Sequence, residues 1–178
     1  MNSLLLSCAT SLAIFSASLT AFAGGDSTPA ISGKEAFEMM KKLAGEWEGK
    51  APASGKMPAV TVTYRVTAAG SAVVETLFPG TGHEMVTMYT MEGDKLALTH
   101  YCAMGNQPHM VLNAKSTATD LIFDFAGGAN INPAKDIHMH SAHIHFDSTD
   151  RITGEWVGYA DGKPTETTKF DKTRKKAA

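Results

Sequence analysis

A chain of 178 residues is long enough to form one domain with a hydrophobic core. Its 16 lysines and arginines are balanced by 18 aspartates and glutamates, which leaves a formal net charge of −2. This balance argues against nucleic acid as a partner, because nucleic-acid-binding domains concentrate basic residues on one face.

Residues 1–23 are predicted to be a secretory signal peptide. A run of apolar and small residues ends in Ala21-Phe22-Ala23, the pattern that signal peptidase cleaves, directly before Gly24. No later apolar run is long enough to span a membrane, so we expect an exported protein, periplasmic or extracellular, without a membrane span. Residues 24–32 are then a linker, and residues 33–178 form the folded domain.

Cleavage at this site removes Cys8 and leaves Cys102 as the remaining cysteine. The folded domain is therefore expected to have no internal disulfide, and its stability must come from its core. Cys102 is either a buried structural thiol or a functional group, and the buried thiol is the commoner case.

One short helix is predicted before a series of strands. Ser32 and Glu35 form a capping box, and apolar residues follow at helical spacing until Gly45, which predicts a helix over residues 33–44. After the helix the apolar period changes to two, beginning with Val60, Val62 and Tyr64 on one face of the first long strand.

About ten short strands are expected in all, because segments of alternating polarity recur between turn signals rich in Gly, Asn, Asp and Pro. No second helical run is long enough for a parallel crossover, so the sheet should be an antiparallel meander. Closing the sheet into an up-and-down barrel would remove its edge strands. A sandwich is the alternative, since alternation alone does not distinguish the two.

The segment LAGEWEGK, residues 43–50, contains Gly45 and Trp47, and Arg174 lies on the last predicted strand. A short helix that leads into Gly-x-Trp on the first strand, with an arginine on the last, resembles the signature of lipocalin-like, or calycin, barrels. This resemblance implies that the indole of Trp47 closes one end of the barrel and that the Arg174 guanidinium stacks over it. Both residues would then be structural.

A more specific resemblance is carried by the segments LTHYCAMGNQPHM, HMHSAHIHF, GEWVGYADGKP and TRKK. Together they are similar to an uncharacterised group of exported bacterial lipocalin-like, calycin-type β-barrel domains, over nearly the whole chain after the signal peptide. The resemblance implies a barrel with a cavity of small-molecule size. It implies no reaction, because a fold alone does not define one.

Four of the seven histidines lie within a single segment, at His138, His140, His143 and His145. In an unbroken strand the first two and the last two would point to opposite faces, and the apolar residues change parity at the same place. We therefore predict a β-bulge at Ser141-Ala142 that gathers the four histidines on one face. The other face then holds the apolar residues Ile137, Met139, Ile144 and Phe146.

The histidine face decides between two interpretations. If apolar residues fill the barrel, as is commoner, the histidines form an outward, solvated ladder. If the histidine face points inward, it becomes a site. His138 and His140 could then share a divalent metal or a haem with His100, and Cys102 could add a fourth donor.

The favoured hypothesis is a non-catalytic carrier or sensor of a small, partly apolar molecule held inside the barrel, with no cofactor. Turn residues Asn106 and Gln107 are predicted at the rim of the cavity. The interior ligand contacts are predicted to be His100, Cys102, Tyr64, Tyr89 and Trp156.

An enzyme is the less favoured class. A thiol-dependent enzyme that uses Cys102 is a further alternative to the carrier and to the metal or haem protein. The motifs of common serine hydrolases, zinc proteases and nucleotide-binding proteins do not occur. These patterns leave the oligomeric state open.

Overall fold

The computed structural model describes residues 30–50 and 60–176. The predicted signal peptide, residues 1–23, and residues 24–29 of the predicted linker lie outside the described residues. Within the described ranges, no helix has the length and apolar character that a membrane crossing requires.

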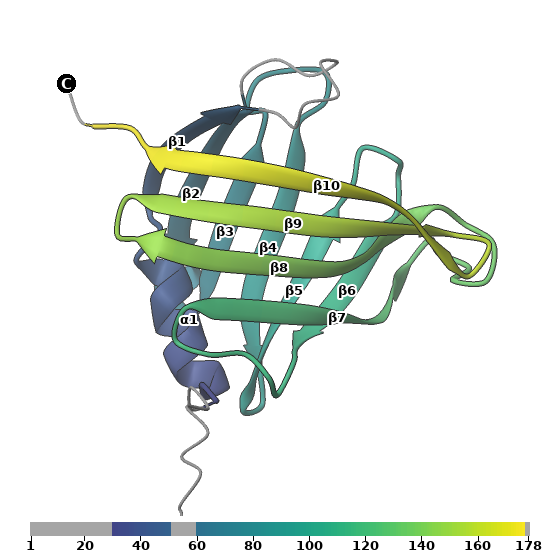
Figure 1. The fold of residues 1–178 in the computed structure, drawn as a ribbon, viewed down its shortest axis with the longest axis horizontal. Helices are drawn as coiled ribbons and strands as arrows, with labels where there is room; N and C mark the ends of the chain where they lie inside the picture. Colours follow the sequence, from purple (N-terminus) through teal and green to yellow (C-terminus); the bar gives the residue numbers. More distant parts are fainter. Residues whose placement is uncertain (1–29, 51–59, 177–178) are drawn as a thin grey trace, which may run out of the picture.

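Ten antiparallel strands close into a barrel, with one short helix at one end (Figure 1). Strands that follow one another in the chain pair with one another, and β1 closes the barrel by pairing with both β2 and β10. The predicted all-β, antiparallel, up-and-down barrel is confirmed, and the sandwich is excluded. The strands are β1 (Gly45–Lys50), β2 (Val60–Thr67), β3 (Ala72–Leu77), β4 (Met85–Glu92), β5 (Lys95–Tyr101), β6 (Gln107–Leu112), β7 (Asp120–Ala129), β8 (His138–Ser148), β9 (Arg151–Ala160) and β10 (Lys163–Arg174), with a 3-10 turn η1 (Ala68–Gly70) between β2 and β3.

Helix α1 (Gly33–Lys41) covers one end of the barrel and packs against β4 and β5 (Figure 1). The predicted capping box is present, because the Ser32 side chain accepts from the Glu35 N–H and the Glu35 carboxylate accepts from the Ser32 N–H. The helix ends at Lys41 rather than at the predicted Ala44. Its last turn is tightened by backbone bonds of the i→i−3 type, such as Ala44 N–H to the Lys41 carbonyl.

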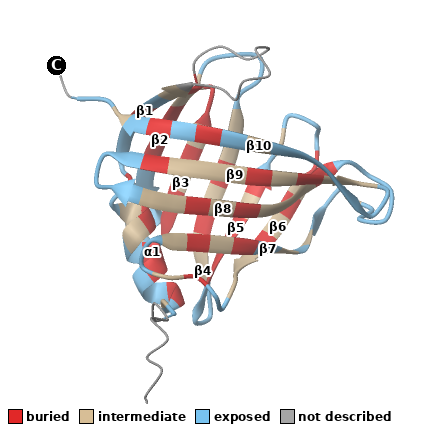
Figure 2. Cartoon of the chain, viewed as in Figure 1, coloured by how far each residue is buried: buried red, intermediate tan, exposed pale blue. Residues whose placement is uncertain are grey.

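Buried and exposed residues alternate along most strands, which Figure 2 shows as red bands separated by tan and blue ones. In β2, for example, Val60, Val62 and Tyr64 are buried, as the alternation predicted. The inward side chains and the buried face of α1 form one continuous core. This alternation places a polar residue inside the barrel wherever one occupies an inward position of the pattern.

Trp47 and Arg174 meet at the α1 end of the barrel. The Arg174 guanidinium lies over the Trp47 ring, 4.5 Å from its centroid, and the indole N–H donates to the Leu43 carbonyl. The guanidinium also donates to the carbonyls of Lys42 and Ala44, which are orphan acceptors at the end of α1. Arg174 therefore ties the helix to the last strand of the barrel.

Strand β8 contains a bulge, but one position earlier than predicted. Met139 pairs with Gly158 and Ser141 pairs with Val157, so His140 is the extra residue. Beyond the bulge, Ala142 and Ile144 are buried in the core.

The bulge leaves the four histidines on the outer face of β8. Met139 packs against the core, so its neighbour His138 points outward, and His143 and His145 alternate with the buried Ile144. Ile137 was predicted to share the apolar face with Met139, and this prediction is wrong. It precedes β8 and is 54% exposed.

The two ends of the barrel differ. Helix α1 lies at the end that carries the β4–β5 and β6–β7 turns, since Ile31 N–H donates to the Ser116 carbonyl and Gly33 abuts Asp94. The antiparallel order puts the β3–β4, β5–β6, β7–β8 and β9–β10 turns at the opposite end. We call this second end the distal end.

Candidate functional site

A row of polar side chains runs around the inside of the barrel on four adjacent strands. Tyr64 on β2 pairs with Glu75 on β3, Glu75 pairs with Thr87 on β4, and Thr87 pairs with His100 on β5. All four are buried. Burying a polar group without a hydrogen-bond partner costs free energy, so each member needs a partner inside the barrel.

Glu75 is the centre of a charged network. Its Oε1 accepts hydrogen bonds from the Tyr64 hydroxyl at 2.8 Å and from Lys172 Nζ at 2.9 Å. Its Oε2 accepts from the Tyr89 hydroxyl at 2.8 Å. Lys172 reaches this point from β10, and Nζ also lies within 5.6 Å of the centroids of the Tyr64 and Phe170 rings. The network therefore joins the two sides of the barrel through its interior.

The charges of this network follow from its contacts. Burial opposes ionisation of Glu75, but the Lys172 ammonium and the hydrogen bonds from Lys172, Tyr64 and Tyr89 outweigh it and lower the pKa of Glu75. Burial, and then the charge of Glu75, raise the pKa of both tyrosines well above the ordinary value. The network is thus one ion pair held by two neutral phenols.

His100 lies beside this network. Its Nδ1 is 2.9 Å from Thr87 Oγ1, and its ring packs against the Trp156 ring with centroids 5.0 Å apart. Burial lowers the pKa of His100 to about 4, although the charge of Glu75 opposes the shift. The imidazole is therefore neutral at pH 7. Among the described residues, its Nε2 has no hydrogen-bond partner.

A cavity of about 120 Å³ adjoins His100 and Trp156. It lies toward the distal end, because its lining comes from the end of β3, the start of β4, the end of β5 and the start of β8. Most of the lining is apolar, and His100 is the ionisable member. The lining residues are Leu77, Phe78, Met85, His100, Met139, Trp156, Thr168 and Phe170.

The predicted interior contacts are not all at this cavity. His100 and Trp156 line it, while Tyr64 and Tyr89 are buried in the neighbouring Glu75 network. Cys102 follows β5, is half-buried, and is not part of the lining. Of the predicted imidazole and thiol, His100 therefore contacts the cavity and Cys102 does not.

Asn106 and Gln107 cross-link turns at the distal end. Asn106 is buried, and its side-chain amide donates to the Ile137 carbonyl at 2.8 Å. Gln107 accepts a hydrogen bond from Asn130 and donates to the Gly105 carbonyl. Both side chains thus hold the β5–β6 turn against the β7–β8 connection, and neither lines the cavity.

His138 and His140 belong to an aromatic cluster on the outer face. His140 stacks on Tyr159 at 3.8 Å and on Phe125 at 4.7 Å between centroids, and this cluster covers His138 completely. His138 Nδ1 donates to the Asp136 carbonyl, so its Nε2 accepts from His140 Nδ1 at 3.0 Å when His138 is neutral.

The predicted metal set of His138, His140 and His100 is not assembled. His100 points into the barrel, whereas the other two point out, and the described residues contain no group of ligand atoms that unites them. The physical reason is the strand alternation, which puts the two apolar stretches of β8 inside and the histidines outside.

The sequence reasoning missed Glu75, Lys172 and Thr87. A signal existed for Glu75, because it shares parity with the buried residues Val73 and Leu77 in AVVETLF. A carboxylate on an apolar face predicts a buried partner of opposite charge. The partner could not be chosen from the pattern, because Lys172 lies 97 residues away.

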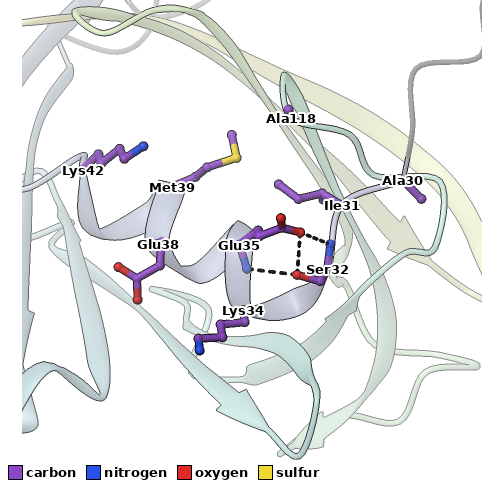
Figure 3. Close-up of a pocket in the computed structure, with 9 residues that line it drawn as sticks. All are labelled: Ala30, Ile31, Ser32, Lys34, Glu35, Glu38, Met39, Lys42 and Ala118. Carbon is purple, nitrogen blue, oxygen red and sulfur yellow. Dashed lines mark hydrogen bonds between the residues drawn. The ribbon is translucent and has the colours of Figure 1, made fainter.

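A second hollow, of about 850 Å³, runs along the outer side of α1 (Figure 3). Three of the polar side chains drawn there already serve the helix, since Ser32 and Glu35 form the capping box and Glu38 pairs with Lys41. Its lining includes Ala30, the first residue that the structure describes. We assign the candidate site to the smaller interior cavity.

No known family model matches this chain, and a search of curated proteins finds no match either.

Proposed function

We propose that the barrel binds a small, flat, partly apolar molecule in the cavity beside His100 and Trp156, without catalysing a reaction. The supporting observation is the composition of the lining, which offers apolar walls, one aromatic face and one imidazole nitrogen that has no hydrogen-bond partner among residues 30–50 and 60–176. Small-molecule sites in proteins usually combine apolar walls with a few placed polar groups.

The size of the cavity limits the ligand. Drug-sized ligands occupy pockets of roughly 300–1,000 Å³, whereas an apolar cavity of roughly 150 Å³ holds benzene. At about 120 Å³, the cavity fits a molecule with a single ring or a short branched chain. Larger ligands would require the side chains at the distal end to move.

Recognition would rest on His100 and Trp156. The neutral imidazole can give or accept one hydrogen bond at Nε2, depending on which tautomer its contact with Thr87 selects. The Trp156 ring supplies a face for stacking. A neutral ligand with one hydroxyl or one ring nitrogen matches both groups.

A binding role is favoured over an enzyme because His100 is the single ionisable residue of the lining, with no carboxylate or thiol beside it as a second catalytic group. Both carboxylate oxygens of Glu75 accept hydrogen bonds inside the protein, and Cys102 does not line the cavity. General acid–base or nucleophilic catalysis needs such a group within hydrogen-bond reach of the substrate.

We also propose that the chain is an exported lipocalin-like protein. The closed barrel, the helix at its end and the Trp47–Arg174 contact support the lipocalin-like part of this proposal. Export rests on the sequence of residues 1–23 alone.

The test uses phenol, pyridine and benzyl alcohol as probes, with two-dimensional NMR of the isotope-labelled protein. We expect saturable shifts of the Trp156 indole N–H signal and a smaller response at Trp47, which lies at the other end of the barrel. Met139→Trp should fill the cavity and remove the response. His140→Gln, which changes an outer histidine, should leave it intact.

Equal responses in the wild-type protein and in Met139→Trp would contradict binding in this cavity, provided that both proteins show the same thermal unfolding. Loss of the response in His140→Gln would move the site to the outer aromatic cluster.

A further inference from the structure

A second histidine pair lies on the outside of the barrel, away from the cavity. Asp120, the first residue of β7, pairs with His145 on β8, and His143 lies two positions before His145 on the same face. The side chains of Asp120, His143 and His145 are 31%, 41% and 39% exposed. Solvent can therefore reach all three.

The three side chains converge on one oxygen. Asp120 Oδ1 is 2.8 Å from His143 Nε2 and 2.7 Å from His145 Nδ1. Partial burial opposes ionisation of Asp120, but hydrogen bonds from Thr119, His145 and His143 prevail and lower its pKa to about 2. Both imidazoles therefore donate to an ionised carboxylate.

These separations are close to those of a metal site. Zinc bonds to nitrogen and oxygen of roughly 2.0–2.1 Å place two ligand atoms about 2.9 Å apart in an octahedron and about 3.3 Å apart in a tetrahedron. The three potential ligand atoms lie within 4.8 Å of one another, and among the described residues they form the one such group of three. After small side-chain rotations, one ion could replace the two protons that His143 and His145 donate to Asp120 Oδ1.

Neighbouring groups hold the ligands in place. Thr119 Oγ1 donates to Asp120 Oδ2 at 2.7 Å, which leaves Oδ1 directed at the histidines. The Asp120 backbone N–H donates to Thr117 Oγ1. Behind His145, Asp147 Oδ1 lies 3.8 Å from Nε2, the nitrogen that faces away from Asp120. A carboxylate behind a ligating imidazole is a common outer partner in metal sites.

We propose that Asp120, His143 and His145 bind one first-row divalent cation of borderline character, Zn²⁺ or Cu²⁺, with water at the remaining positions. Two imidazole nitrogens and one carboxylate oxygen suit these ions, whereas Mg²⁺ and Ca²⁺ prefer oxygen ligands throughout. By the Irving–Williams order, Cu²⁺ binds more tightly than Zn²⁺. The site is on the outer face and does not depend on the proposed ligand cavity.

The test is calorimetric titration of the untagged protein with zinc chloride and, separately, with copper chloride in a weakly coordinating buffer. We expect one ion per chain for each metal and none with magnesium chloride. The variants His143→Ala and His145→Ala should each weaken zinc binding by at least roughly 10- to 100-fold. Loss of a residue that only supports a ligand already has an effect of this size, and loss of a ligand should have a larger one. Asp120→Asn should also weaken it.

Two matched variants remove a histidine elsewhere. His83→Ala changes an exposed residue in the β3–β4 turn, and His140→Ala changes the outer aromatic cluster, so both should bind zinc as the wild-type protein does. Copper-bound wild-type protein should show coupling to two imidazole nitrogens in its electron paramagnetic resonance spectrum, and His143→Ala should show one.

Unchanged zinc affinity in the His143→Ala/His145→Ala double variant would overturn the proposal. So would loss of binding in His140→Ala, which would assign the ion to the His138–His140 pair. Thermal unfolding of each apo variant shows whether its fold is intact. Phenol binding, measured on the same samples, tests the proposed ligand cavity separately. Failure of the metal proposal can therefore be distinguished from failure of the cavity proposal.

Discussion

Two ionic clusters of similar geometry lie on opposite sides of the barrel wall. Inside, Glu75 accepts hydrogen bonds of 2.8–2.9 Å from Lys172, Tyr64 and Tyr89. Outside, Asp120 accepts hydrogen bonds of 2.7–2.8 Å from His143 and His145. The side chains of the inner ion pair are 1% and 4% exposed, whereas those of the outer cluster are 31–41% exposed.

The difference in exposure changes what the same contacts do. Inside the barrel water cannot replace a lost partner, so each group of the network depends on the others. On the outside water can solvate either partner, so the contacts add little stability and the ligands are free to exchange protons for a metal ion. Burial thus makes the inner cluster structural and leaves the outer one available for binding.

The largest expected effect comes from breaking the inner pair. Lys172→Met leaves Glu75 buried without its counter-charge and should lower the free energy of unfolding by about 3–5 kcal/mol. Urea denaturation followed by circular dichroism measures this. The double variant Glu75→Gln/Lys172→Met removes both charges and should recover part of the loss. A double variant less stable than Lys172→Met would contradict this account of the pair.

A smaller effect is expected from His100 as the pH falls. Its pKa is about 4 in the folded protein, below the ordinary value of 6.5, so the unfolded chain takes up a proton first as the pH falls below 6.5. The stability that His100 contributes is therefore complete above pH 6.5. It should fall by up to about 3 kcal/mol as the pH approaches 4.

Urea denaturation at pH 7 and pH 4.5 measures this dependence. His100→Gln should flatten it relative to the wild-type protein. Partial burial also lowers the pKa of His140, so His140→Gln is the matched variant and should flatten the curve less. Equal pH dependence in the wild-type protein and in His100→Gln would show that His100 is not buried in neutral form.

In exposure, Arg174 lies between the inner ion pair and the outer cluster, because its side chain is 22% exposed. Its guanidinium donates to carbonyls at the end of α1. Arg174→Lys keeps the charge but loses the planar fork and the stacking on Trp47, and should destabilise the protein by about 1–2 kcal/mol. Arg151→Lys is the control, since Arg151 makes a bidentate but exposed pair with Asp171. Equal losses of stability in Arg174→Lys and Arg151→Lys would contradict the greater structural role assigned to Arg174.

The smallest effect is expected at the outer cluster without metal. Asp120→Asn should lower the free energy of unfolding by less than about 1 kcal/mol, as for other exposed ion pairs. Urea denaturation in the presence of a chelator measures it. A loss as large as that of Lys172→Met would remove the contrast between the two clusters.

The strand pattern predicted most of the fold. Alternation in segments such as AVTVTYRVT, together with the turns between them, led to the ten strands and their antiparallel order. The capping box at Ser32 predicted where α1 begins. The β8 bulge was expected one position away from His140. Local propensities and periodicity are enough for these features, because each depends on residues that are neighbours in the chain.

The sites were harder to predict, because their members are far apart in sequence. Asp120 and His145 are 25 residues apart, and neither segment by itself indicates that the two strands pair in that register. The alternative in which His138 and His140 share a site with His100 is wrong, because the barrel wall lies between them.

The sequence alone determined the class of fold, the approximate number of strands and the apolar face of strands such as β2, because these follow from side-chain periodicity and turn chemistry. Only the tertiary structure decided which polar groups meet. Closure of the barrel brings Glu75 of β3 and Lys172 of β10 together across its interior, and strand register sets Asp120 beside His143 and His145 on its surface. Pairing of charges depends on distance in space, and closure and register set that distance.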